Sequence, residues 1–276
     1  MKEKLTGYLE LGMQAKNGTY RAKTLLQMGA SRVSPAMYLD NSGIPCYFML
    51  SLGGGFVSGD QYENKFVLED EAKLILTTQS PNKIFKSPHQ IPAVQKTSIY
   101  LGKGSQLEYI ADSLIAYEDA YYMQDTVIHM EEDASLVYID GITPGWAPTG
   151  EKFKYDEVKL KTQIYRDGQP ILLDYLKLTP KTSKMQELGM LEHYTHFGTM
   201  MVIDARITDE IVKEIRGLID ELDKPIHYGI SKPYCKGFVL RVLGHLTQDI
   251  EKAIEVCHDY IRTKVYDIEP LRLRKY

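Results

Sequence analysis

The side chains of this sequence best suited to chemistry are carboxylates that follow apolar strands. One of them, Asp60, ends a loop in which four of the seven residues 53–59 are glycine. Glycine allows positive φ angles and close backbone approach, so Gly54, Gly55 and Gly59 would form a structural loop that holds Asp60 toward a cavity. The loop is not a phosphate-binding P-loop, because no Lys-Ser/Thr pair ends it. A tight turn is the alternative explanation of the glycines.

A second carboxylate, Asp140, closes the apolar stretch 135–139. The Pro/Gly-rich loop that follows carries the only tryptophan, Trp146, and leads to Glu151. Two carboxylates on either side of a sugar could act as the acid and base of a glycosidase. The sequence does not fix their separation, so a β-rich carbohydrate-active hydrolase that uses two of Asp60, Asp140, Glu151 and Asp174 is kept as the alternative function.

Histidines and nucleophiles give weaker signals. His193 and His196 are three residues apart with Glu192 outside the pair, which departs from the H-E-x-x-H zinc pattern. On a strand or turn the two rings need not converge, and two ordinary polar histidines are the favoured interpretation. No G-x-S-x-G nucleophile motif is present, so the sequence offers no nucleophile with a base beside it.

Composition narrows the class of protein. The 276 residues include 33 basic and 37 acidic side chains, and the net charge of -4 disfavours binding to nucleic acid. The three cysteines are far apart and odd in number, which suits a reducing compartment without a disulfide framework. No secretory leader and no apolar run of about 18 residues is visible. We therefore expect a cytoplasmic protein without a membrane partner.

The elements that must position the carboxylates are mostly strands. Up to about residue 205, short segments rich in Val, Ile, Thr and Tyr recur every 8 to 12 residues or so, which favours a sandwich, barrel or β-helix over βαβ units. Apolar stripes then predict helices over 209–222, capped by Thr208, and over 248–264, capped by Thr247. Cys257 would be a core residue of the second helix. We expect one structural unit over 1–276, with a β-rich body (1–205) and an α/β C-terminal portion (206–276).

Several short motifs follow one another along the chain. They are Gly54, Gly55, Gly59 and Asp60; Leu76, Thr77, Thr78, Lys83, Phe85 and Ser87; Asp140, Gly145, Gly150, Glu151 and Phe153; Leu172, Leu173 and Asp174; Val239 to Leu243; and Leu271, Arg272 and Arg274. In this order they resemble the UreD family of urease accessory proteins, called UreH in some systems, over roughly residues 5–276. The chain departs from the family at Trp146, where an arginine is common, so any ion pair there would be lost.

The resemblance implies a mainly β fold: a β-helix-like stack of strands with two α-helices in the C-terminal portion. It implies a non-enzymatic chaperone that binds apo-urease, recruits UreF and through it the GTPase UreG, and helps deliver nickel. A dimeric UreD–UreF–UreG assembly is one implied form. No cofactor would be tightly bound, and Ni²⁺ would pass transiently.

The resemblance also implies an internal passage for the metal. Asp60, Asp140 and Asp174 would bind Ni²⁺ weakly, and Ser87, Trp146 and Glu151 would line the route. Oxygen ligands suit a borderline ion that must leave again, whereas a cage of imidazoles and thiolates would trap it.

Tyrosine is unusually frequent, with 20 residues against seven Phe and one Trp. Its ring has an apolar body and a polar tip, which suits half-buried strands and interfaces. We expect some of these rings, Tyr121 and Tyr122 among them, to be exposed anchors for a partner protein. A plain binding module with a Tyr-rich face is the third interpretation.

Overall fold

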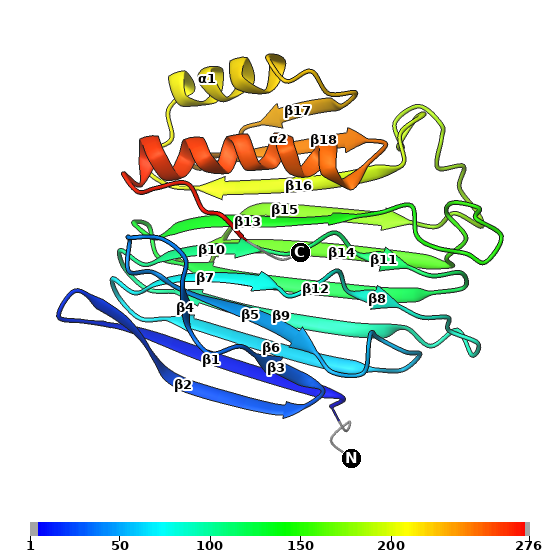
Figure 1. The fold of residues 1–276 in the computed structure, drawn as a ribbon, viewed down its shortest axis with the longest axis horizontal. Helices are drawn as coiled ribbons and strands as arrows, with labels where there is room; N and C mark the ends of the chain where they lie inside the picture. The colour runs from blue at the N-terminus through cyan, green and yellow to red at the C-terminus, as the bar shows by residue number, and fades with distance from the viewer. Residues whose placement is uncertain (1–4, 274–276) are drawn as a thin grey trace.

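The structure, a computed structural model, describes residues 5–273, and most of its strands lie in two large sheets (Figure 1). The first, sheet A, has the order β15-β14-β12-β9-β6-β1-β2. Its strands are β1 (Gly7–Lys16), β2 (Thr19–Gly29), β6 (Gln61–Leu68), β9 (Ala93–Leu101), β12 (Tyr121–Met130), β14 (Glu157–Arg166) and β15 (Gln169–Leu178).

Sheet B has the order β17-β18-β16-β13-β10-β7-β5-β3, and β4 also pairs with β5. Its strands are β3 (Ser31–Val33), β4 (Met37–Tyr38), β5 (Pro45–Ser51), β7 (Lys73–Thr78), β10 (Gln106–Ile110), β13 (Ser135–Ile142), β16 (His196–Ile203), β17 (His227–Ser231) and β18 (Gly237–Gly244). Two short strands, β8 (Lys83–Ile84) and β11 (Ile115–Ala116), pair with each other.

The middle of the chain alternates between the sheets and forms a β-solenoid of about four turns. The successive pairs β5–β6, β7–β9, β10–β12 and β13–β14 each place one strand in sheet B and the next in sheet A, and neighbouring turns pair in parallel. The strands alternate side chains between the interior and solvent, as the burial of β9 shows. The expected mainly β, β-helix-like stack is therefore confirmed.

The two helices lie near the last strands of sheet B (Figure 1). Helix α1 (Asp209–Asp220) begins after Thr208, whose Oγ1 accepts a hydrogen bond from the Ile211 amide at 3.4 Å, as the sequence predicted. Helix α2 (Thr247–Tyr260) continues into a π-helical turn, Ile261–Val265. Thr247 is the first helical residue and Leu246 takes the N-cap position without a side-chain bond, so the predicted cap at Thr247 is wrong.

Apolar side chains fill two main layers. Between the sheets, side chains such as Phe66 and Tyr109 form the interior core. Outside sheet B, a second cluster joins Ile215 of α1 and Cys257 of α2 to Phe238 of β18, which confirms Cys257 as a core residue. The described residues include no helix that is both long and apolar enough to cross a membrane.

Candidate functional site

A polar cavity of about 60 Å³ lies inside the solenoid, between the two sheets. This volume suits a few water molecules rather than an organic ligand. Its polar lining comes from both sheets, and includes Asn64, Gln95, Gln124, Tyr109, Tyr138 and Asp140. The Tyr138 hydroxyl lies 3.4 Å from both the Gln124 amide nitrogen and Thr126 Oγ1, so side chains of the two sheets meet at the cavity.

Strand register makes this interior polar. Asn64, Thr97, Thr126, Thr162 and Asp174 are successive partners across sheet A, and the first four belong to parallel strands. Parallel strands in register carry equivalent residues on one face, so one polar residue per turn builds a continuous row. Neighbouring rows on the same face are apolar, as Phe66, Ile99 and Ile128 illustrate. The polar row runs through the core and ends at Asp174.

Two of the predicted metal residues meet at the end of this row. Asp140 of β13 pairs in register with Thr199, which pairs with Arg241 of β18. The Arg241 guanidinium donates to the Asp174 carboxylate and forms an ion pair that joins the two sheets. The Asp174 charge is close enough to Asp140 to raise the pKa of Asp140. The structure thus brings together two of the three predicted acids and adds Arg241, to which the sequence assigned no role in the site.

The environment of Asp140 makes it titrate near neutrality. Burial raises its pKa to about 7, and the nearby Asp174 charge adds to the increase, while Arg241 opposes it. Asp140 can therefore gain or lose a proton close to neutral pH, unlike an aspartate with an ordinary pKa.

A larger groove of about 550 Å³ lies outside sheet B, beneath α2 and the C-terminal segment. Ile250 and Ile254 of α2 line it, together with Leu271. Asp140 and the adjacent residues Ala111 and Asp112 line both this groove and the interior cavity. The two hollows are therefore separated by one shared wall that contains Asp140.

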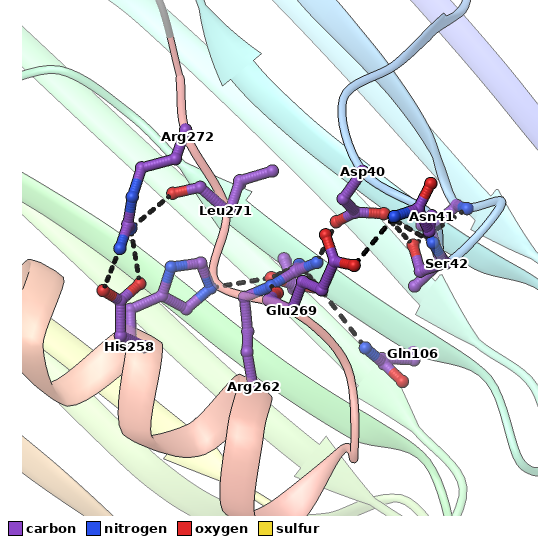
Figure 2. Close-up of polar contacts among 12 residues, drawn as sticks. Asp40, Asn41, Ser42, Gln106, His258, Arg262, Glu269, Leu271 and Arg272 are labelled. Carbon is purple, nitrogen blue, oxygen red and sulfur yellow. Dashed lines mark hydrogen bonds and ion pairs between the residues drawn. The ribbon is translucent and has the colours of Figure 1, made fainter.

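A buried charge cluster holds the C-terminal segment beside the groove. Arg262 has no exposed surface, and its Nη1 donates to both Glu108 carboxylate oxygens, at 2.7 and 2.6 Å. It also pairs with Asp40 and donates through Nε to the Glu269 carbonyl at 2.7 Å. Figure 2 shows Arg262 projecting from the helical end toward Asp40 and Glu269, with His258 beside it.

His258 completes this cluster, with its Nε2 2.7 Å from Glu108 Oε2. Burial alone would raise the pKa of Glu108, but hydrogen bonds and charges from His258 and Arg262 hold it below the ordinary value. Glu108 is therefore an anion that fixes the end of α2 to the sheet.

Asp60 lies at a turn and does not line the cavity. Its Oδ1 accepts from Thr6 Oγ1 at 3.0 Å, and its Oδ2 accepts from the Val57 amide at 2.8 Å. These bonds close the glycine-rich loop, in which Gly54 and Gly55 have φ values of 81° and 151°. A Cβ on Gly55 would lie 2.5 Å from the Lys83 carbonyl oxygen, so the predicted structural need for glycine is confirmed there. A metal-binding role for Asp60 stays a prediction.

The other predicted passage residues lie outside both hollows. Ser87 is buried, and its Oγ donates to the Ile91 carbonyl at 3.2 Å. Trp146 is 53% exposed and packs on Tyr117. Glu151 is exposed and pairs with Lys154 at 3.1 Å. None of the three lines the interior cavity or the groove, because each belongs to a loop beyond the strand ends.

The two tyrosines expected as exposed anchors differ in position. Tyr121 is half-buried with Lys159 over its ring, whereas Tyr122 is 0% exposed and packs near Phe56 in the interior. The expectation that Tyr122 presents an exposed ring is wrong, because neighbouring strand residues point to opposite faces. Much of the tyrosine excess serves the core, since Tyr47, Tyr62, Tyr109, Tyr122, Tyr138 and Tyr155 are all buried.

This difference predicts unequal effects on stability. Tyr122→Leu should lower the free energy of unfolding by about 1–3 kcal/mol, because a buried ring and its hydroxyl are lost. Tyr121→Leu, one residue away on the other face, should change it by less than about 0.5 kcal/mol. Urea unfolding followed by circular dichroism measures both values, and equal losses would contradict the buried placement of Tyr122.

The chain is similar to known proteins over almost its whole length. A family model described as UreD urease accessory protein matches residues 5–275. The urease accessory protein UreD of Lachnoclostridium phytofermentans is 38% identical over 98% of this chain and 98% of its own length. The proteins of the same name from Bacillus cereus and Ureaplasma parvum are 33% and 38% identical, and cover 98% and 88% of this chain.

Proposed function

This chain belongs to the UreD family of urease accessory proteins, and on that premise we propose that it binds apo-urease, recruits UreF and through it the GTPase UreG, and helps deliver nickel. The name shared by its relatives supports a role in urease maturation and is consistent with a protein that is not itself a catalyst. A dimeric assembly with UreF and UreG, in the cytoplasm, is part of the proposal.

The observation that carries the nickel step is the position of Asp140 in the wall between the interior cavity and the outer groove. We propose that Ni²⁺ crosses this wall with Asp140 and Asp174 as transient oxygen ligands. Ni²⁺ would have to displace the Arg241 guanidinium from Asp174. This competition keeps the residence time of the ion short. Among the described residues that line the cavity there is neither a thiol nor an imidazole to trap the ion.

The hydrolase alternative finds less support in this geometry. The cavity of about 60 Å³ at Asp140 is smaller than the roughly 300–1,000 Å³ typical of small-molecule sites. The outer groove of about 550 Å³ falls in that range, but Asp140 is the one of the four carboxylates that lines it. Two other carboxylates of that hypothesis have partners outside the cavity. Asp60 accepts hydrogen bonds within a turn, and Glu151 forms an ion pair with Lys154. Asp174 forms an ion pair with Arg241 and lines neither the cavity nor the groove.

Co-expression with urease and its other accessory proteins tests the proposal. Omitting this chain should leave urease largely without nickel and inactive. Asp140→Ala should still be recovered with its partners from a pull-down, yet lower the nickel content of purified urease by at least about tenfold if the carboxylate is needed at the wall. Nickel is measured by mass spectrometry and partner recovery by gel densitometry.

Glu151→Gln is the matched control, because it neutralises an exposed carboxylate outside both hollows. It should load urease normally. Full urease activation without this chain would refute the maturation role. Normal loading with Asp140→Ala would refute only the route through the wall.

A further inference from the structure

A cluster of imidazoles lies at one end of sheet B. His193 precedes β16, His227 is the first residue of β17, and His245 directly follows β18. All three are exposed and surround the half-buried Tyr194. The centre of the Tyr194 ring lies 4.0 Å from that of His193, 5.1 Å from His245 and 6.3 Å from His227.

Backbone bonds hold two of these histidines side by side. The Thr195 amide donates to the Gly244 carbonyl at 3.0 Å, which ties the segment after His193 to the residue before His245. Glu192, just before His193, has a φ of 52°, a left-handed conformation that redirects the chain. The centres of the His193 and His245 rings are consequently 5.7 Å apart.

The histidine beside His193 in space is His245, not His196, which is nearer in sequence. His196, three residues after His193, is the first residue of β16, and its Nδ1 lies 2.9 Å from Thr195 Oγ1. Burial lowers the pKa of His196 to about 4, and nearby Lys152 and His245 add to the decrease. The sequence considered His193 only together with His196, and the neighbouring His245 at the end of β18 was not foreseen.

We propose that His193 and His245 form a surface site for one borderline divalent transition-metal ion, such as Ni²⁺ or Zn²⁺. At a metal–nitrogen distance of about 2.0–2.1 Å, two imidazoles on one tetrahedral ion have ring centres roughly 5 Å apart. The observed 5.7 Å needs only a small rotation of exposed side chains. No group of three or more His, Cys, Asp and Glu among residues 5–273 has metal-holding geometry, so water would fill the remaining positions.

This site goes beyond the proposed function and does not depend on it. Imidazole nitrogens prefer ions of the nickel and zinc type to Mg²⁺, which prefers oxygen ligands. The chain should therefore bind Ni²⁺ and Zn²⁺ at this site, and Mg²⁺ should not compete.

Calorimetric titration of the full chain with NiCl₂ and with ZnCl₂ tests the site. His193→Ala and His245→Ala should each weaken the binding by at least about tenfold. His129→Ala is the matched control, because His129 also stacks on aromatic rings, those of Tyr100 and Tyr165, each at 5.3 Å, but belongs to sheet A. It should bind like the parent chain.

A second measurement does not depend on the variants. In nitrogen-15 spectra of the histidine rings, paramagnetic Ni²⁺ should broaden the His193 and His245 signals before those of His129. The proposal is overturned by the absence of saturable binding, by equal binding of the two alanine variants and the parent, or by first broadening at His129.

Discussion

Arg262→Ala is expected to lower the free energy of unfolding by about 3–5 kcal/mol. Arg262 is fully buried, and the substitution would leave Glu108 and Asp40 as buried carboxylates without their guanidinium partner. Uncompensated buried charge is among the most destabilising changes in a protein. Urea unfolding followed by tryptophan fluorescence and circular dichroism measures the loss.

The same substitution should loosen the C-terminal segment. Arg262 holds the Glu269 carbonyl, and Leu271 packs a few residues later in a small apolar cluster with Ile44 and Cys46. Because Leu271 and Arg272 line the groove, we expect the variant to be cleaved by trypsin near residue 272 much faster than the parent. The groove would thereby lose one of its sides.

Arg272→Ala is the matched control. Arg272 pairs with Asp259 at 2.9 Å, but its side chain is 55% exposed, so its loss should cost less than about 1 kcal/mol. Arg262→Lys keeps the charge without the fork of donors and should fall between the two alanine variants. If Arg262→Ala and Arg272→Ala unfold at the same urea concentration, the buried cluster does not anchor the segment.

Features of the fold that depend on neighbouring residues could be predicted from the sequence, whereas those that depend on distant residues could not. Alternating strands and the helix that begins after Thr208 are encoded within a few residues, so the sequence revealed them. The choice of a solenoid among the possible β folds came only from the family resemblance. Equivalent positions of successive turns need side chains of suitable size and polarity, but they need not share a repeated sequence. Asn64, Thr97, Thr126 and Thr162 are equivalent in space but differ in identity and surroundings.

The site shows the same limit. The family resemblance named Asp140 and Asp174, but it did not name Arg241, the ion-pair partner of Asp174, which lies 67 residues beyond Asp174 in the sequence. The Glu108–Arg262 contact spans 154 residues, and nothing in the local sequence marks either side chain as buried. Conversely, Ser87, Trp146 and Glu151 stand near recognisable motifs but belong to loops whose direction only the closed solenoid decides.

Asp140→Asn is expected to stabilise the chain in a pH-dependent way. The pKa of Asp140 is about 7 in the folded chain, against an ordinary value of 3.8, chiefly because the carboxyl is buried. From about pH 4 to about pH 7 the folded chain therefore holds a proton that the unfolded chain has released. As the pH rises through this window, the free energy of unfolding of the parent should therefore fall. That of a variant without an ionisable group at position 140 should not show this decrease.

The advantage of Asp140→Asn should accordingly be near zero at pH 4, grow up to pH 7 and stay constant above it. Its upper limit is roughly 3–4 kcal/mol, which corresponds to a pKa displacement of about three units. Urea unfolding at pH 4, 5.5, 7 and 8.5 gives the profile. Glu151→Gln, at an exposed carboxylate, should give a nearly flat difference over the same range.

The stability profile also decides how a loading defect is to be interpreted. Because Asp140→Asn removes a buried charge, the variant should be more stable than the parent at pH 8. If Asp140 is also a transient nickel ligand, as proposed, the same variant should transfer less nickel to urease. Unfolding cannot explain a defect in a stabilised variant, so that combination would assign the carboxylate to the metal step. A variant that is less stable than the parent at pH 8 would instead mean that Arg241 fully compensates a charged Asp140, and that the carboxylate supports the fold.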